Sequence, residues 1–411
     1  MDNNKKTIIL YGSVGLKTNM GDQAMIFTFA DYFLKNENVN VFLLNDIRES
    51  EREKYGFNVI QDIPLKHMIK EINLLLGLCY QLITFNKKYD ENSIKETINI
   101  FKKSDLLFCL NGFLLSSQMS FANTIGSMIK ILYAKKFGKR LIVLPQSVGP
   151  FDYKGIKKFI FNLLFKKAMT YPEIIYLREE AGYQLMKERN LKNIALEHDL
   201  VLSRSSDINL SRILKKIPEA IDFSQFEIDN TKDILVNPNF RFLKYEKEQD
   251  VVDFFSQIII QYLNYSEGKA YLFAHDYIMD RDLCEKIYEK VKNNDKVIYI
   301  REEFYCTEIE QFFSLFNIGV VSRWHALVHS IRAILPAVVL GWSEKYRETA
   351  RLFEIEENLI DIRDGLDVKK VIDCLIRVKN NRKILEDKIC EKHDKIKKTF
   401  VLERKGELWL K

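Results

Sequence analysis

The stretch GVVSRWHALVHSIRAILPAVVLGWSEKY, from Gly319 to Tyr346, decides the expected fold of this chain. A short apolar and β-branched run from Ile318 to Val321 predicts a buried parallel strand. Apolar residues then recur at helical spacing until Pro336, which predicts a helix. Ser322 to Trp324 is therefore a strand-to-helix junction, where open α/β sheets bind ligands and where free backbone N–H groups attract anions.

Arg323 and His325 at this junction predict a site for an anionic substrate. A guanidinium, an imidazole and the N-terminus of a helix would converge there, and each of them favours negative charge or proton transfer. The alternative is that Arg323 is an ordinary surface charge and that His325 is a histidine packed in the core. The combination of the two residues at one junction favours the site.

The composition limits the class of protein. A chain of 411 residues is long enough for about two domains. Its 63 basic and 57 acidic residues give a net charge of +6, which allows a local basic surface but does not suggest a nucleic-acid-binding protein. The six cysteines are scattered, without a C-x-x-C pair or zinc spacing. This pattern predicts reduced thiols in a cytoplasmic protein and no metal site.

Two segments raise the question of membrane contact. Ile72 to Phe85 is apolar, but it is shorter than the roughly 20 residues that a bilayer requires and contains Asn73 and Gln81, so we expect a buried or interfacial helix. Tyr153 to Met169 is basic, with Phe and Leu at helical spacing. This second pattern suits an ordinary amphipathic helix, which we favour, or a helix that lies on an anionic membrane.

Strands alternate with helical stretches in two series. The first series of strands is predicted at residues 7–11, 39–44, 57–60, 105–110, 141–144 and 174–177. The second is predicted at residues 233–237, 270–273, 297–300, 318–321 and 337–340, after a polar segment from 203 to 232. We therefore expect an α/β protein with two Rossmann-like domains that face each other across a cleft. The N-terminal domain would span residues 1–205 and the C-terminal domain residues 230–380, and a helical tail at 381–411 would cross back to the first domain.

Glycines and polar residues gather where the predicted strands end. Asn111 and Gln146 follow two strands of the first series, and Arg178 follows a third. Because the carboxyl ends of parallel strands open on one edge of a sheet, these residues are expected at one cleft. The loop from Gly12 to Ala24 is either a substrate loop or a capped turn, since it matches neither a dinucleotide fingerprint nor a P-loop. Asp199, with His198, is either a site residue or part of a turn.

Five motifs, in this order, resemble those of the polysaccharide pyruvyl transferase family. They are N-M-G-D-Q-A at Asn19 to Ala24, N-G-F-L-L at Asn111 to Leu115, P-Q-S-V-G-P at Pro145 to Pro150, L-R-E-E at Leu177 to Glu180 and S-R-W-H-A-L at Ser322 to Leu327. The resemblance covers about residues 7–353 and implies a fold similar to the two-domain GT-B glycosyltransferases. It also implies transfer of an enolpyruvyl unit from phosphoenolpyruvate, as co-substrate, to a sugar as a ketal, without a cofactor.

The resemblance further implies roles for individual residues. Arg323 would be the main donor-binding residue, because its planar fork matches carboxylate and phosphate oxygens. His325 would be the acid that titrates near neutral pH, and Asp22 or Asp199 the base for the sugar hydroxyl. The donor site would comprise Ser322, Arg323, Trp324, His325 and Arg178, and the acceptor site Asn19, Gly21, Asp22, Asn111 and Gln146.

Two other functions remain open. A GT-B glycosyltransferase would bind the diphosphate of a nucleotide sugar through Arg323. A non-catalytic relative would bind sugars or anions within a capsule assembly complex, and this alternative is kept open by Trp324 and Phe113, which depart from the family's pattern. The expected partners are phosphoenolpyruvate and a sugar acceptor that is part of a surface polysaccharide or of its lipid- or nucleotide-linked precursor. Peripheral contact with the inner face of the membrane would suit a lipid-linked acceptor, and no nucleic acid is expected.

Overall fold

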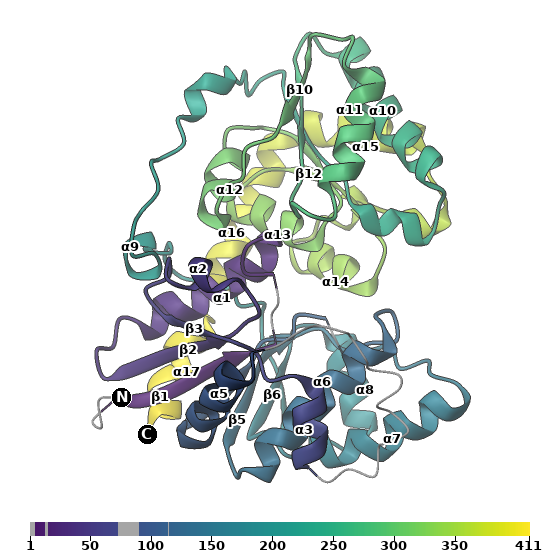
Figure 1. The fold of residues 1–411 in the computed structure, drawn as a ribbon. Helices are drawn as coiled ribbons and strands as arrows, with labels where there is room; N and C mark the ends of the chain where they lie inside the picture. The colour runs from purple at the N-terminus through teal and green to yellow at the C-terminus, as the bar shows by residue number, and fades with distance from the viewer. Residues whose placement is uncertain (1–4, 13–14, 73–89, 114) are drawn as a thin grey trace.

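Two parallel α/β sheets form the two halves of the protein, as seen in the computed structural model, which describes residues 5–12, 15–72, 90–113 and 115–411 (Figure 1). The strands of the first sheet lie in the order β3-β2-β1-β4-β5-β6-β7, and those of the second in the order β10-β9-β8-β11-β12-β13. In each sheet the chain adds strands first toward one edge and then, from the centre, toward the other edge, as doubly wound folds do. The predicted fold of two Rossmann-like halves is therefore confirmed.

The first half is built from a buried sheet with helices on its faces. Its central strands are buried and largely apolar beyond their first residues, because a parallel sheet covered on both faces has no solvent side. The strands are β1 (Lys6–Tyr11), β2 (Val39–Leu44), β3 (Asn58–Ile60), β4 (Leu106–Cys109), β5 (Arg140–Gln146), β6 (Ile174–Leu177) and β7 (Ile194–Leu196). The helices are α1 (Met20–Phe33), α2 (Glu49–Arg52), α3 (Leu65–Glu71), α5 (Glu91–Lys103), α6 (Phe121–Lys136), α7 (Gly155–Met169) and α8 (Glu180–Glu188).

The second half begins after a connector that contains α9 (Leu210–Ile213) and the short 3-10 helix η1 (Phe223–Phe226). Its strands are β8 (Ile234–Asn237), β9 (Ala270–Phe273), β10 (Val297–Ile300), β11 (Gly319–Val321), β12 (Ala337–Gly341) and β13 (Leu359–Asp361). Its helices are η2 (Phe240–Lys244), α10 (Glu248–Tyr265), α11 (Arg281–Val291), α12 (Cys306–Phe313), α13 (Trp324–Arg332), α14 (Glu344–Leu352), η3 (Glu356–Asn358), η4 (Ile362–Asp364) and α15 (Val368–Asn380). The deciding stretch thus folds as predicted, into β11, α13 and β12.

The C-terminal helices tie the two halves together. After α16 (Arg382–Lys397), α17 (Val401–Leu410) returns to the first half (Figure 1). There the ring of Trp409 lies 5.5 Å from the ring of Phe108, measured between centroids. The backbone oxygen of Trp409 also accepts a hydrogen bond of 3.0 Å from Arg140 Nη1. The prediction that the tail crosses back to the first domain is confirmed.

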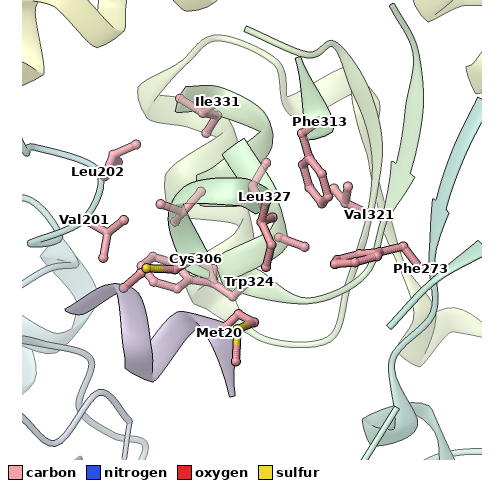
Figure 2. Close-up of a cluster of buried hydrophobic side chains, with 14 of the residues drawn as sticks. Met20, Val201, Leu202, Phe273, Cys306, Phe313, Val321, Trp324, Leu327 and Ile331 are labelled. Atoms are coloured by element: carbon pink, nitrogen blue, oxygen red, sulfur yellow. The ribbon is translucent and has the colours of Figure 1, made fainter. Parts of the chain in front are cut away.

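An apolar cluster joins the halves next to the junction between β11 and α13. Met20 of α1 lies beside Trp324 of α13, and Leu202 of the first half and Leu327 of α13 belong to the same cluster (Figure 2). Hydrogen bonds cross between the halves on both sides of this cluster. Cys306 N donates to Gln23 Oε1 at 2.8 Å, and Glu348 of α14 accepts the backbone N–H groups of Glu180 and Ala181 at 2.7 and 3.0 Å. The residues between the two sheets are therefore held in a defined arrangement.

Among the described helices, none combines the length and the apolar character that crossing a bilayer requires. The buried or interfacial helix predicted from Ile72 to Phe85 falls, apart from Ile72 itself, outside the described residues.

Candidate active site

A cleft of about 300 Å³ lies between the two halves. The first half contributes residues that follow β1, β4 and β6, and the second half contributes the start of α13 and the loops after β8 and β12. The cleft brings together most of the residues that the sequence points to, namely Asn19, Asp22, Asn111, Arg178, Arg323, Trp324 and His325. These residues meet because the carboxyl ends of the parallel strands of both sheets open toward the same gap.

Ser322 fixes the junction between β11 and α13 but does not line the cleft. Its hydroxyl donates a hydrogen bond of 2.5 Å to the backbone oxygen of Asn237, and its own backbone oxygen accepts from Asn239 Nδ2 at 2.8 Å and from Tyr346 Oη at 3.0 Å. The side chain is fully buried. The prediction that Ser322 contacts the donor is wrong, because every direction in which its polar atoms point is already occupied by protein.

Arg323 lies in the cleft with its charge already paired. Its guanidinium forms a two-pronged contact with Asp280, in which Nη2 lies 2.7 Å from Oδ1 and Nε donates to Oδ2. Nη1 lies 3.4 Å from Asp276 Oδ2. Burial lowers the pKa of Arg323, but the attraction to the Asp280 carboxylate is stronger, and the net effect raises the pKa. The guanidinium therefore stays charged and rigidly oriented, and its contribution to anion binding comes from orientation more than from free charge.

Arg178 reaches the same cleft from the first half and is also paired. Nη1 donates to Asp199 Oδ2 at 2.7 Å, and Nη2 donates to Ser147 Oγ at 2.7 Å and to the backbone oxygen of Gly112 at 2.9 Å. Asp199 additionally accepts the backbone N–H of Val201 at 2.9 Å. Both oxygens of Asp199 thus accept hydrogen bonds from the protein, and of the two residues predicted as the base only Asp22 lines the cleft.

Trp324 packs across the gap between the halves. Its ring lies under the guanidinium of Arg178, with 4.3 Å between Cζ and the ring centroid. Its indole N–H donates to Thr349 Oγ1 at 3.1 Å. Trp324 is thus held in one position between the halves, where its aromatic face stabilises the guanidinium of Arg178.

Two further cations line the cleft, and they have no carboxylate partner among the described residues. They are Arg241 in η2 and Lys345 in α14. The ammonium of Lys345 lies over the rings of Phe113, Trp342 and Trp324, at 4.7, 5.2 and 5.6 Å from their centroids. Burial, followed by the charge of Arg178, lowers the pKa of Lys345 to about 7. The sequence analysis did not single out either residue as a ligand, although Arg241 follows the carboxyl end of β8 by only a few residues.

His325 lines the cleft and rests against the first turn of α1. Its Nε2 is buried and has no hydrogen-bond partner in the described part of the chain. Burial, followed by the charges of Arg178 and of neighbouring groups, holds the pKa of His325 well below its ordinary value of 6.5. The imidazole is therefore neutral in the free protein. The prediction that it titrates near neutral pH is wrong for the free protein, because burial disfavours the charged imidazole and the positive charge of Arg178 adds to this effect.

Gly21 makes room for the imidazole. A Cβ atom added to this glycine would lie 2.1 Å from His325 Nδ1. Gly21 is buried in α1 and does not line the cleft, so the prediction that it contacts the acceptor is wrong. Its role is to let two helices from different halves approach each other.

We expect Gly21→Ala to lower turnover about 100-fold, because displacing a catalytic group by about 1 Å has an effect of this size. Alanine is otherwise favoured over glycine in a helix, so the loss would come from displacement of the imidazole. Steady-state kinetics of Gly21→Ala, His325→Ala and the double variant measure the effect. The double variant should be no slower than His325→Ala, and full turnover in Gly21→Ala would contradict the close contact.

Asn19, Asp22 and Asn111 line the cleft from the first half. Asn19 caps α1, because its Oδ1 accepts the backbone N–H groups of Gly21 and Asp22 at 3.0 and 3.2 Å. Asp22 Oδ2 accepts the backbone N–H of Gly15 at 3.1 Å. The described residues of the predicted loop, Gly12 and residues 15–24, thus provide both a capped helix start and part of the wall of the cleft.

Gln146 lies behind the wall of the cleft. Its side chain is buried and does not line the cleft, while its backbone oxygen accepts the backbone N–H of Arg178 at 3.1 Å. The prediction that Gln146 contacts the acceptor is wrong. It is the last residue of β5, and the alternation of side chains along a strand directs it into the protein.

The charges of the cleft favour an anionic ligand. Arg323 and Arg178 form ion pairs with buried carboxylates, whereas Arg241 and Lys345 form no ion pair with a described carboxylate. The N-terminus of α13 also opens here, and its N-cap residue Arg323 makes no side-chain capping bond. Backbone N–H groups at a helix start attract anions. In the described part of the chain, no group of three or more His, Cys, Asp or Glu side chains is placed to hold a metal ion.

A family model described as polysaccharide pyruvyl transferase matches residues 19–344. The chain belongs to the polysaccharide pyruvyl transferase family. The matched range begins at the cap of α1 and includes Arg178, Arg323 and His325, so this pyruvyl transferase family member carries the family's sequence on both sides of the cleft. Membership associates the protein with polysaccharide pyruvylation in general and with the transferase class. A comparison with curated protein sequences found no match.

Solved structures similar to this pyruvyl transferase family member share its architecture over almost the whole chain. The co-structure of MnaA from S. aureus with UDP has a TM-score of 0.60 at 12% sequence identity and covers 98% of this chain and 97% of that one. UDP-GlcNAc 2-epimerase from Neisseria meningitidis bound to UDP-GlcNAc has a TM-score of 0.58 at 10% identity, covering 98% and 99%. At such low identity the similarity shows the GT-B type of fold alone.

Proposed function

We propose that this protein transfers an enolpyruvyl unit from phosphoenolpyruvate to two hydroxyl groups of a sugar, forming a pyruvate ketal and releasing phosphate. The sugar would belong to a surface polysaccharide or to its lipid- or nucleotide-linked precursor. The observation that carries the proposal is the cleft of a pyruvyl transferase family member in which Arg323 and His325 lie beside two cations that lack carboxylate partners.

Donor binding would use the cations at the two ends of the ligand. Phosphoenolpyruvate carries a carboxylate and a phosphate, so it needs several donors around a small molecule. Arg241 and Lys345 supply positive charge that forms no ion pair with a described carboxylate, and the α13 N-terminus supplies backbone N–H groups. Arg323 supplies a fixed guanidinium, because Asp280 holds its orientation. Arg323 and Arg178, which are paired with carboxylates, would therefore shape the site. Arg241 and Lys345, which form no ion pair with a described carboxylate, would attract the donor.

The chemistry needs one proton at carbon and two hydroxyl attacks. The negative charge of the donor raises the pKa of His325, so that the imidazole carries a proton when the donor is bound and gives it to the methylene carbon. The first sugar hydroxyl then bonds to C2, and its proton passes to Asp22. The bond between C2 and the phosphate oxygen breaks, the second hydroxyl bonds to C2, and its proton leaves with the phosphate. All atoms of the donor and acceptor are thereby accounted for in the ketal and in phosphate.

The acceptor would reach the donor through a second cavity. This cavity has a volume of about 500 Å³ and shares Phe113 and Lys345 with the donor cleft. Its walls carry aromatic and hydrogen-bonding side chains from the loop after β5 and from α8, including Phe151, Asp152 and Gln184. Such a mixture suits sugar rings and hydroxyls. The proposed acceptor route thus differs from the one expected from sequence, which included the buried Gly21 and Gln146.

Isothermal titration calorimetry and phosphate release test the proposal. Phosphoenolpyruvate should bind, UDP- and GDP-sugars should not, and a panel of sugar acceptors should include one that supports phosphate release with loss of two acceptor hydroxyls by mass spectrometry and NMR. Binding of a nucleotide sugar without binding of phosphoenolpyruvate would instead support the GT-B glycosyltransferase alternative. Donor binding without turnover on any acceptor would support a non-catalytic relative.

The affinity for phosphoenolpyruvate should weaken as the pH rises above about 7, the value near which the pKa of Lys345 lies. The ammonium is present below this pH and is lost above it, and an anionic donor binds the charged form, so the dissociation constant should rise by up to about tenfold per pH unit. Calorimetric titrations between pH 6 and pH 9 measure this slope.

Lys345→Arg is the matched control for this pH dependence, because arginine keeps its charge throughout the range. Ionisation of the donor itself is common to both proteins and cancels in the comparison. An equal slope in the two proteins would show that Lys345 is not the group that titrates.

A further inference from the structure

Helix α7 exposes an apolar stripe on its outer face. Ile156, Phe159 and Leu163 are 68%, 64% and 47% exposed, and their spacing of three and four residues places them on one side of the helix. The opposite side is buried through other residues, among them Phe161 and Leu164. The packing of α7 on the first half therefore does not use the stripe, and large apolar side chains grouped in this way on a surface indicate a binding face.

Lysines surround the stripe. Lys154, Lys157, Lys158, Lys166 and Lys167 are exposed, and α7 contains no acidic residue. None of these lysines forms an ion pair with a carboxylate among the described residues. Lys166 and Lys167 flank the stripe at helical spacing, whereas Lys157 lies over the ring of Phe121. The outer face, defined by Ile156, Phe159, Leu163, Lys166 and Lys167, thus combines positive charge without an ion pair with apolar side chains, as helices that lie on anionic membranes do.

The charge decides between the possible occupants of this face. A second copy of the chain that presented the same face would bring its Lys166 and Lys167 against those of the first copy, and like charges repel each other. An anionic bilayer offers negative headgroups to the lysines and an apolar layer to Ile156, Phe159 and Leu163. The charge therefore favours the bilayer.

The acceptor cavity opens beside this helix. Pro150, Phe151 and Asp152 line the cavity and come directly before α7 in the chain. Arg189, also in the cavity wall, lies over the rings of Phe151, Phe161 and Phe165 at 5.1, 5.3 and 5.0 Å from their centroids. These contacts fix the cavity wall to α7, and α7 and α8 lie next to each other at the edge of the first half (Figure 1).

We propose that the outer face of α7 docks the protein on an anionic lipid bilayer and thereby presents the acceptor cavity to a lipid-linked sugar. The docking stands on the exposed side chains alone, and only its use for acceptor delivery rests on the proposed function. The sequence pattern from Tyr153 to Met169 left both an ordinary amphipathic helix and a membrane-surface helix open, and the exposure of Phe159 and its neighbours favours the second.

Vesicle flotation tests the docking separately from turnover. The protein should float with phosphatidylcholine vesicles that contain phosphatidylglycerol, and binding should fall at least tenfold with pure phosphatidylcholine or at high salt, since salt screens the attraction. Replacing the stripe with serines should also lower binding at least tenfold; the variant is Ile156→Ser, Phe159→Ser, Leu163→Ser. A matched control changes three equally exposed apolar residues elsewhere and should bind like the unmodified protein; it is Tyr265→Ser, Ile384→Ser, Leu408→Ser.

Three results would overturn the docking proposal. They are undiminished vesicle binding by the stripe variant, equal loss in the control variant, and a dimer in light scattering that the stripe variant dissociates, which would assign the face to self-association. Both variants should keep phosphate release with a water-soluble acceptor. If neither they nor the unmodified protein release phosphate while flotation behaves as expected, the proposed function fails and the docking stands.

Discussion

His325→Ala should lower phosphate release about 100- to 10,000-fold, the range typical of losing a general acid or base. In the free protein the imidazole is neutral, and its buried Nε2 has no hydrogen-bond partner in the described residues. A bound trianionic donor would supply the negative charge that lets the ring hold a proton. Steady-state kinetics with phosphoenolpyruvate and a competent acceptor measure the loss.

The variant should bind phosphoenolpyruvate with an affinity within a few-fold of the unmodified protein, because the charged groups of the cleft remain. Its circular dichroism should be unchanged, since removing this ring breaks no hydrogen bond that the structure describes. His198→Ala is the matched control, because His198 lines a different cavity from the donor cleft, and its turnover should be unchanged. Turnover by His325→Ala at the unmodified rate would remove His325 from the mechanism.

The sequence predicted the junction at Arg323 and His325 because the change from strand to helical periodicity is local. Residues 318–336 contain the whole signal, and β11 and α13 fold where it places them. Strand β13, which was not predicted, has no such local signal in the sequence. Its three residues are only half-buried, so neither an apolar run nor an alternation marks them.

The sequence could not predict how the charges of the cleft are balanced. Asp280 pairs with Arg323 across 43 residues and Asp199 with Arg178 across 21, and both pairs exist only after the sheets have formed. The same limit applies to the pKa of His325, which depends on burial and on cations from both halves. Arg241 was missed for a simpler reason, since the strand predicted at residues 233–237 ends four residues before it and the loop that follows carried no motif.

Membership in a sequence motif did not predict which side chains line the cleft. Ser322, Gly21 and Gln146 belong to three motifs of the pyruvyl transferase family, yet none of the three lines the cleft. Side chains of neighbouring residues point in different directions on a strand or a helix. Such residues support their neighbours instead: Ser322 holds the β11 end, Gln146 holds the backbone of Arg178, and Gly21 makes space for His325.

Glu310→Gln should destabilise the protein by about 3–5 kcal/mol, the cost typical of removing one partner from a buried ion pair. Glu310 of α12 accepts from Arg204 Nη2 at 2.8 Å and from Arg332 Nε at 2.9 Å. The two arginine side chains are only 4% and 6% exposed, so the variant would leave two buried like charges close together. Because Arg204 belongs to the first half and Arg332 to the second, the loss should weaken the connection between the halves.

The stability difference between the unmodified protein and Glu310→Gln should depend on pH in a defined direction. Burial opposes ionisation of Glu310, but Arg204, the hydrogen bond with His329 and Arg332 together outweigh it and hold the pKa of the carboxyl below its ordinary value of 4.5. A carboxyl with a depressed pKa in the folded state stabilises the fold above the unfolded value and loses this contribution as the pH falls. The difference in urea stability between the two proteins should therefore be full at pH 7 and should narrow below about pH 4.5. Glu173→Gln, which removes a half-exposed partner of Arg140, is the control and should change stability far less. A similar loss of urea stability in Glu310→Gln and Glu173→Gln would show that the cluster of Glu310, Arg204 and Arg332 does not join the halves.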